Sequence, residues 1–275
     1  MTLQIPSLSG FEGIRSGLRA EPSFLIIGSQ KAGTTSLFNY LLKHPCVLGP
    51  TQKEVHYFSD TFLKGRSWYQ NHFPPLTAVY RRAVKTGRRP VTGEASPYYI
   101  FHPCAPERVH STLPKAKIIV MLRNPVDRAY SHYKYHVKLG AEDLAFEDAL
   151  NVEEERLAGE DEKLIADDSY FSFNHKMFSY QSRGRYIEQL KRWARYYSVG
   201  DMLIVRSEDF FEDSESIFAD VLRFLGLPEH RLPEYQKFNA GGGDRMNPET
   251  RARLLDYFAP YNKRLYQFLG REMGW

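Results

Sequence analysis

Four apolar runs recur along the chain, and each has the length of a buried strand. They cover residues 24–28, 90–94, 117–123 and 201–207. Continuous apolar runs of this kind are typical of parallel strands that are covered on both faces. Helical patterns separate them, at residues 34–44, 105–113, 126–139, 145–159, 186–197, 214–225 and 247–269. The alternation predicts an α/β fold, with a central parallel sheet flanked by helices.

The sequence predicts a single domain over residues 22–275. It has no internal repeat and no low-complexity linker, and residues 1–21 are of mixed character and are expected to form a loose arm. In open parallel sheets, ligands bind outside the carboxyl ends of the strands. Segments that follow the predicted strands are therefore the first places to look for chemistry.

Composition narrows the class of protein. The 275 residues include 42% hydrophobic and 25% charged positions, as in ordinary globular domains. No apolar run approaches the length of a membrane-spanning helix, and the first residues lack the features of a signal peptide. Two cysteines favour a reducing, cytoplasmic location. A net charge of +4 is too small to argue for nucleic-acid binding.

The segment after the first strand has the form of a phosphate-binding loop. Gly28 and Gly33 bracket a tight turn, and a helix is expected to start at Thr34. Backbone N–H groups and the positive end of that helix would face an anion. A nucleotide triphosphatase places its lysine after the second glycine, whereas here Thr34 and Thr35 follow Gly33 and the lysine is Lys31. We expect a P-loop-like anion site; the alternative is a closely packed turn.

The third strand ends in an arginine where a P-loop ATPase usually has a magnesium-binding aspartate nearby. Arg123 is followed by Asn124-Pro125 and a predicted helix that carries Ser131. An arginine at a strand end and a serine on the next helix suit a second phosphate. Taken alone, Arg123 would more simply be a structural ion-pair residue.

A Glu-x-His pair follows the first helix. In an extended chain, Glu54 and His56 would point to the same side. A carboxylate and an imidazole together suit general base catalysis, with one group orienting the other. The simpler alternative is a pair on the protein surface.

A glycine-rich segment precedes the last helix. Three consecutive glycines lie between Phe238, which could stack on a base, and Arg245. The segment is predicted to close over a bound nucleotide, although such a run is commonly a plain linker.

These segments, in this order, resemble sulfotransferases that use 3′-phosphoadenosine 5′-phosphosulfate (PAPS), and most of all the heparan sulfate N- and 3-O-sulfotransferases. The likeness spans residues 24–275. It rests on the motifs Ile-Ile-Gly-Ser-Gln-Lys-Ala-Gly-Thr-Thr-Ser and Val-Met-Leu-Arg-Asn-Pro-Val-Asp-Arg-Ala-Tyr-Ser, on Ser-Arg-Gly-Arg-Tyr at 182–186, and on the C-terminal stretch from Tyr257 to Trp275. The fold implied is the P-loop nucleotide-binding-like α/β domain.

The resemblance implies a role for each matching position. Lys31 would stabilise the departing phosphate, and Glu54, assisted by His56, would deprotonate the acceptor. The remaining positions would bind the nucleotide: Ala32, Gly33, Thr34 and Thr35 at the 5′-phosphate, Arg123 and Ser131 at the 3′-phosphate, Phe238 near the adenine, and Gly243, Asp244, Arg245, Met246 and Asn247 as a cover. No metal is expected, because a sulfuryl group carries less charge than a γ-phosphoryl group.

The sequence departs from the family at three points. Ala95 stands where the heparan sulfate enzymes have a lysine near the acceptor. The cover segment has Gly243-Asp244-Arg245 where Lys-Gly-Arg is usual, so Asp244 adds a negative charge near a phosphate. The disulfide-closed hairpin of the animal enzymes is missing. The first departure leaves the acceptor open.

The main hypothesis is sulfuryl transfer from PAPS, which leaves 3′-phosphoadenosine 5′-phosphate (PAP), to a hydroxyl or amine, most readily on a glycan. A small alcohol, a lipid-linked sugar and a lipid or polyketide hydroxyl remain alternatives. Other classes are a small-molecule P-loop kinase and a non-catalytic nucleotide- or glycan-binding module. The kinase would need a lysine after Gly33, and the module would lack Glu54 and His56.

Overall fold

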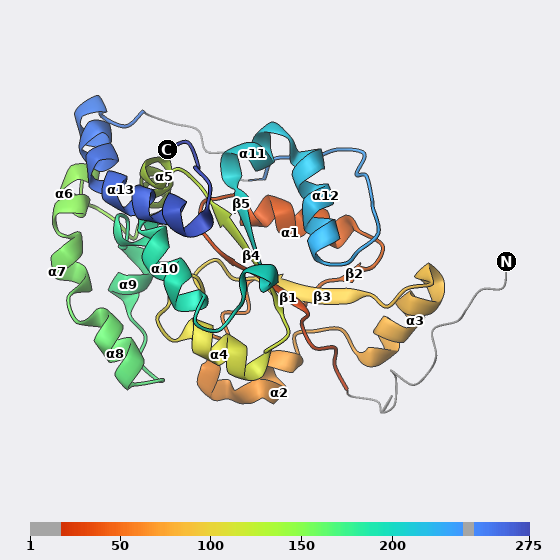
Figure 1. Ribbon diagram of the computed structural model, residues 1–275. Coiled ribbons are helices and arrows are strands. Elements are labelled where there is room, and N and C mark those ends of the chain that lie inside the picture. The colour runs from red at the N-terminus through yellow and green to blue at the C-terminus, as the bar shows by residue number, and fades with distance from the viewer. Residues whose placement is uncertain (1–17, 239–244) are drawn as a thin grey trace.

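The computed structural model describes residues 18–238 and 245–275 and contains one parallel sheet of five strands. Their spatial order is β2-β3-β1-β4-β5 (Figure 1), and all the strand pairs are parallel. The strands are β1 (Phe24–Gly28), β2 (Val47–Leu48), β3 (Val91–Ala95), β4 (Lys117–Leu122) and β5 (Met202–Arg206). The predicted α/β class and the four predicted strands are confirmed, and only the short edge strand β2 was not predicted.

Strand register brings the candidate segments to one edge of the sheet. Leu25 of β1 pairs with Glu94 of β3 on one side and with Ile118 of β4 on the other. The three strands therefore end together, so the segments that follow Gly28, Ala95 and Leu122 lie side by side. This is the edge at which parallel sheets bind ligands.

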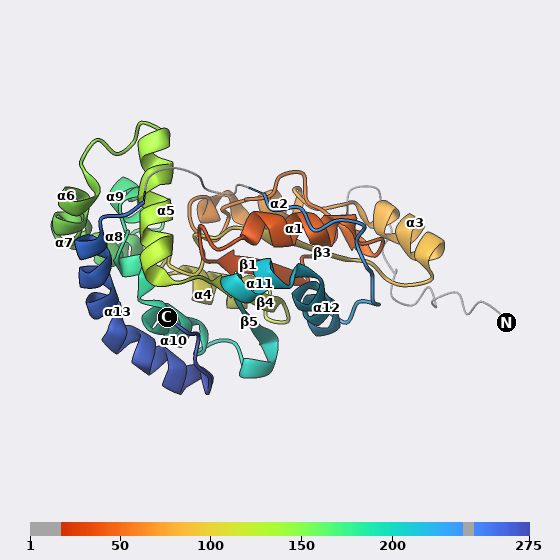
Figure 2. The same cartoon turned by 90° about the horizontal axis from the view of Figure 1, so that it is seen from above.

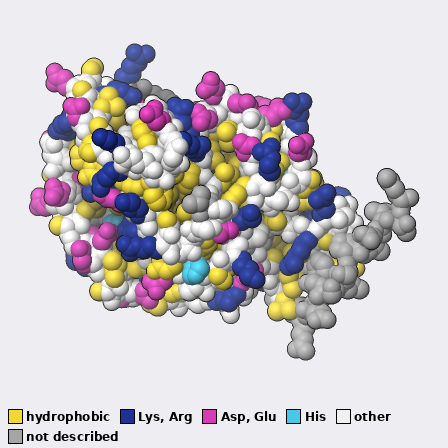
Figure 3. All heavy atoms as spheres, in the orientation of Figure 1, with side chains coloured by type: hydrophobic (Ala, Val, Ile, Leu, Met, Phe, Trp, Pro, Cys, Tyr) yellow, Lys and Arg dark blue, Asp and Glu magenta, His cyan; other side chains and the backbone are white. Residues whose placement is uncertain are grey.

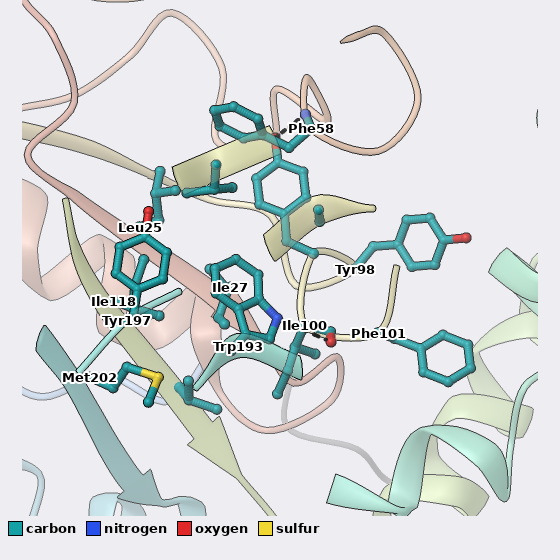
Figure 4. Close-up of a cluster of buried hydrophobic side chains, with 14 of the residues drawn as sticks. Leu25, Ile27, Phe58, Tyr98, Ile100, Phe101, Ile118, Trp193, Tyr197 and Met202 are labelled. Atoms are coloured by element: carbon teal, nitrogen blue, oxygen red, sulfur yellow. Dashed lines mark hydrogen bonds between the residues drawn. The ribbon is translucent and has the colours of Figure 1, made fainter. Parts of the chain in front are cut away.

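Alternate residues of the strands pack against different helices. Phe24 and Ile26 face α1 (Thr34–Lys43) and α12 (Ser214–Phe224), whereas Leu25 and Ile27 belong to the core on the other face. That second core includes α4 (Ala105–Thr112), α10 (Tyr186–Trp193) and the end of α13 (Pro248–Leu269). Figure 4 shows Trp193 of α10 beside Ile27 and Ile100, in the middle of this cluster.

A helical group stands at one end of the sheet. Figure 2 shows α5 (Pro125–Lys138) between the sheet and this group, which comprises α6 (Phe146–Asn151), α7 (Glu153–Leu157), α8 (Glu160–Ala166) and α9 (Phe173–Met177). The single helix predicted over 145–159 is wrong: two helices meet at Val152. The carboxylate of Glu153 is buried at that junction, where it accepts hydrogen bonds from the backbone N–H groups of Gln181 and Ser182.

The remaining elements are mostly short. They are η2 (Phe62–Lys64), α2 (Gly65–Gln70), α3 (Leu76–Thr86), η3 (Ser182–Gly184), η4 (Val199–Asp201) and α11 (Ser207–Glu212). Of the predicted N-terminal arm, the structure describes only the last part. There, the N–H of Ala20 donates to Pro74, and the carbonyl of Leu18 accepts from Leu76. In the described ranges, no helix combines the length and the hydrophobicity needed to cross a membrane.

Candidate active site

The loop between β1 and α1 is shaped by two glycines. A Cβ on Gly28 would lie 2.4 Å from Cγ2 of Ile100, so no side chain fits there. Gly33 has φ = 95°, in the left-handed region that favours glycine. Lys31 also has a positive φ, of 73°, which is uncommon for a residue with a side chain and is often found at functional sites. The predicted tight loop is thus present, with its lysine in an unusual backbone conformation.

The N-terminus of α1 is open to an anion. Its N-cap residue is Gly33, which has no side chain to cap the helix, and its first turn contains no acidic residue. The first N–H groups of a helix have no partner within it, and the helix dipole makes that end positive. Gly33, Thr34 and Thr35 line a cavity of about 750 Å³, which is therefore bordered by N–H donors.

Most of the predicted site residues share this one cavity. It is lined by Lys31, Gly33, Thr34, Thr35, Glu54, His56, Arg123, Ser131 and Phe238. Ala32 is fully buried beneath the loop. Arg245, Met246 and Asn247 are described but do not line the cavity, and Gly243 and Asp244 lie outside the described residues. The structure thus brings together the loop between β1 and α1, the Arg123–Ser131 pair and the Glu-x-His pair.

The side chain of Lys31 lies among other positively charged side chains. Its Nζ lies 4.5 Å from the centre of the Tyr135 ring, and it forms no ion pair with a carboxylate in the described ranges. Burial lowers the pKa of Lys31, and the nearby charges of Arg123, Lys138 and Lys134 lower it further. A bound anion would relieve this repulsion, so the environment favours a negatively charged ligand.

Arg123 is tied to the same loop. Its Nη1 donates to the carbonyl of Lys31 at 3.1 Å, and the backbone carbonyl of Arg123 accepts from the hydroxyl of Tyr186 at 2.8 Å. Asn124 caps α5 by accepting from Val126 N at 3.0 Å. This cap fixes the start of the helix, and Ser131 projects from it into the cavity. Arg123 and Ser131 therefore border the same cavity, and their binding of a second phosphate stays a prediction.

The carboxylate of Glu54 is held by two basic neighbours. One oxygen lies 2.6 Å from Lys53 Nζ and the other lies 3.3 Å from His56 Nε2. Burial acts to raise the pKa of Glu54, but hydrogen bonds and charge from His56 and Lys53 outweigh it and bring the pKa to about 2. The segment is not extended as predicted, because His56 has φ = 55°. The two side chains nevertheless meet, so a deprotonated carboxylate borders the cavity.

The buried carboxylate of Glu94 holds the backbone of the segment from Glu54 to His56 in place. It is fully buried at the end of β3 and accepts from Ser96 Oγ at 2.6 Å, Tyr69 Oη at 2.9 Å and Val55 N at 3.1 Å. Burial raises the pKa of Glu94 despite these donors. The bond to Val55 fixes the backbone between Glu54 and His56. Nothing in the sequence distinguishes this structural carboxylate from a catalytic one.

Ala95 does not border the cavity. It is fully buried against the core that contains α1, so the expectation that position 95 lies near an acceptor does not hold for this side chain. Its N–H donates to the carbonyl of Lys53 at 3.2 Å. Lys53, on this neighbouring segment, does line the cavity.

The C-terminal cover segment is only partly described. The N–H of Phe238 donates to Ser36 Oγ of α1 at 3.0 Å, which places Phe238 at the cavity. Asn247 caps α13 by accepting from Glu249 N at 2.9 Å, and Met246 packs against the core beside α5. The closure predicted for residues 243–247 stays a prediction.

Several cavity residues were not predicted. They include Gln30, Lys53, Tyr98, Lys134, Tyr135, His136, Lys176, Arg183, Phe211 and Lys237. Gln30 and Arg183 lie inside motifs that the sequence made conspicuous. The others come from helix faces and loops that only the tertiary structure brings to the cavity.

Comparisons with known proteins agree with this geometry. Residues 21–248 match the family model described as the sulfotransferase domain. The chain is 26% identical to the membrane-associated sulfotransferase kil1 of Dictyostelium discoideum, covering 92% of this chain and 66% of that protein. It is 28% identical to heparan sulfate glucosamine 3-O-sulfotransferase 3B1 of Mus musculus, covering 98% and 68%.

The chain spans only part of some of these relatives. It matches 30% of the length of the bifunctional heparan sulfate N-deacetylase/N-sulfotransferase 1 of Caenorhabditis elegans, at 29% identity. Among solved structures, a sulfotransferase from Alicyclobacillus acidocaldarius aligns with a TM-score of 0.70 and 30% identity, over 92% of this chain and 97% of that one. The predicted resemblance is confirmed: the chain belongs to the sulfotransferase domain family.

Proposed function

We propose that this chain transfers a sulfuryl group from PAPS to an acceptor hydroxyl or amine. The observation that carries the proposal is one cavity with an anion cradle at Lys31 and a carboxylate–imidazole pair at Glu54 and His56. The first feature suits an anionic donor, and the second suits removal of a proton from a nucleophile.

The residues present fit a donor that bears anions at two places. Among the described residues, seven lysines and arginines and three carboxylates line the cavity: Lys31, Lys53, Arg123, Lys134, Lys176, Arg183 and Lys237 against Glu54, Asp127 and Glu208. The loop and Lys31 would hold the 5′-phosphosulfate, and Arg123 with Ser131 would hold the 3′-phosphate. The rings of Phe211 and Phe238 border the same cavity and are suited to an adenine.

Each protein group then has a task in the reaction. When bound, PAPS supplies an activated sulfuryl group. Glu54 accepts the proton of the acceptor hydroxyl or amine, while His56 orients the carboxylate. Lys31 and the N–H groups of the loop stabilise the negative charge that develops on the leaving phosphate. These fixed charges are in place before the reaction, so little reorganisation is needed.

The acceptor is proposed by analogy with the relatives. Two of the similar proteins are named for heparan sulfate, so a glycan acceptor is the first choice. A lipid, polyketide or small-molecule alcohol is the alternative. The exposed ring of Tyr135 and the aliphatic side chain of Leu139 line the cavity and would contact apolar parts of any of these acceptors.

Thermal unfolding with nucleotides tests the donor. We expect PAP to raise the melting temperature more than ATP with magnesium does, since ligands that bind only the folded state stabilise it. Stabilisation by ATP with magnesium alone would favour the kinase reading and remove PAPS from the proposal.

A further inference from the structure

Arg183 is a buried cation that has no counterion among the residues that the structure describes. It lies in η3, is only 4% exposed, and donates to four uncharged acceptors. Its Nε donates to Ser179 Oγ at 2.7 Å, and its Nη1 donates to Gln30 Oε1 at 2.6 Å. Its Nη2 donates to the carbonyls of His175 and Lys176. It forms no ion pair with any carboxylate of residues 18–238 and 245–275. Buried charges are costly when unpaired, so the arrangement leaves room for an anion.

Two other arginines with little exposed surface, Arg108 and Arg156, do have carboxylate partners. Arg108 is also nearly buried and pairs with Asp168 at 2.6 Å, and Arg156 pairs with Glu142 at 2.6 Å. Arg128 is buried without an ion pair in the described part of the chain, but it does not line the cavity. Arg183 differs from all of these, because it combines burial, an uncompensated charge and a place in the cavity wall.

Aromatic rings hold the guanidinium of Arg183 in place. Its centre lies 4.8 Å from the Tyr98 ring and 5.1 Å from the Phe101 ring. Figure 4 shows these two rings extending from the core toward the same side. His175 stacks on Phe101 and lies 2.7 Å, through Nδ1, from the Tyr98 hydroxyl. Burial lowers the pKa of Arg183 to about 9, so the group stays charged at neutral pH.

The bond to Arg183 fixes the orientation of the Gln30 amide. A guanidinium has donors only, so Gln30 must present its oxygen to Arg183 and its NH₂ group elsewhere. Gln30 precedes Lys31 in the loop between β1 and α1 and lines the cavity. Within the described ranges, no group accepts from its Nε2. An oriented donor therefore borders the cavity next to Lys31.

We propose that Arg183 is a positioning residue that aims the Gln30 amide at the sulfuryl group of the donor. The inference rests on the proposed function and adds two residues to it. Arg183 acts through Gln30 and through its own uncompensated charge, while the Gln30 NH₂ group contacts a sulfuryl oxygen. A donor that lacks the sulfuryl group would not use this contact.

The affinities of PAPS and PAP, measured by calorimetry without an acceptor, separate this contact from the rest of the site. In Arg183→Lys and in Gln30→Met, we expect PAPS affinity to fall about tenfold, the size of one hydrogen bond to a charged group. PAP affinity should change less than threefold. The double variant should lose no more PAPS affinity than the single variant that binds PAPS more weakly, since the two substitutions remove the same contact.

Arg185→Lys is the matched control. Arg185 belongs to the same motif but bonds to Ser182 Oγ, and it lines a different hollow. Its ratio of PAPS to PAP affinity should equal that of the wild type. If PAPS and PAP affinities fall equally in Arg183→Lys and Gln30→Met, the two residues have a purely structural role and the inference is overturned. Wild-type affinity for both nucleotides in these variants would overturn it as well. If Arg183→Lys does not fold, Gln30→Met alone decides. A wild-type protein that binds neither nucleotide contradicts the proposed function itself.

Discussion

Single residues in the cavity derive their properties from neighbours on other segments. Lys31 gains its positive surroundings from Arg123 and α5, and Glu54 is held deprotonated by Lys53 and His56. The two groups have opposite charges and line one cavity. Substitutions at these positions should therefore affect chemistry more than folding.

Lys31→Ala should lower kcat at least 100-fold, the usual effect of removing one group that stabilises developing charge. Folding stability should not fall, because the substitution removes a repelled cation. Steady-state kinetics and thermal unfolding measure the two effects. Lys138→Ala is the control: Lys138 contributes to the same positive field but does not line the cavity. Near-normal turnover in Lys31→Ala would remove this residue from the mechanism.

Glu54→Gln should reduce kcat about 10²- to 10⁴-fold, as expected for loss of a general base. Binding of PAP should persist, because the nucleotide residues are untouched. The measurement is kcat together with a nucleotide dissociation constant. If Glu54→Gln stays active while His56→Ala does not, the roles of base and orienting group are exchanged.

Lys53→Met should shift the pH profile. Burial acts to raise the pKa of Glu54, and Lys53 and His56 together hold it at about 2. Removal of Lys53 leaves burial less opposed, so this pKa rises and the carboxylate becomes protonated at a higher pH. The acid limb of kcat/KM should therefore move to higher pH. An acid limb that stays in place would mean that Glu54 is not the titrating base.

A comparison of the predicted with the observed strands and helices shows how far the sequence determines the fold. The long apolar runs gave β1, β3, β4 and β5, because a buried parallel strand has few alternatives once both its faces are apolar. The two-residue strand β2 carries no periodic signal, and the break at Val152 depends on Glu153 reaching residues 181–182 across space. Contacts of that kind are not encoded in the local pattern.

Asn124→Ala tests the link between an element and the site. Asn124 caps α5, which carries Ser131, so loss of the cap should cost about 1 kcal/mol and weaken PAP binding. Asp213→Ala removes a comparable cap from α12, where Asp213 accepts from Ser216 N at 3.0 Å. Chemical denaturation and calorimetry should show similar losses of stability, with reduced PAP affinity only in Asn124→Ala. Equal PAP affinity in both variants would contradict a positioning role for α5.

At the scale of the whole molecule, charge is mixed on the surface and histidine is concentrated inside. Figure 3 shows basic and acidic side chains interspersed over one face. The buried histidines are His44, His102, His132, His136 and His175. The loop, Arg123 and the Glu-x-His pair were predicted because they follow strand and helix ends, whereas Arg183 required the tertiary structure. A cytoplasmic location stays a prediction.

Acid should destabilise the protein through these histidines. Burial lowers the pKa of each, to about 4 for His136, so below pH ~6.5 the unfolded chain binds protons that the native state does not. Stability should be greatest above pH ~6.5 and fall as the pH decreases. His132→Phe should reduce the slope by about one proton, because neither ring nitrogen of His132 has a partner in the described residues. Denaturation between pH 5 and 7 measures this, and an unchanged slope would contradict it.

Transfer of radiolabelled sulfuryl from PAPS to a panel of acceptors tests directly whether this protein is a PAPS-dependent sulfotransferase. The panel would hold glycans, lipid-linked sugars and small alcohols, with Lys31→Ala as the reference of low activity. We expect a labelled acceptor and stoichiometric PAP with the wild-type protein, and both to form at least 100-fold more slowly with Lys31→Ala. Labelling from the γ-phosphate of ATP, with none from PAPS, would contradict it.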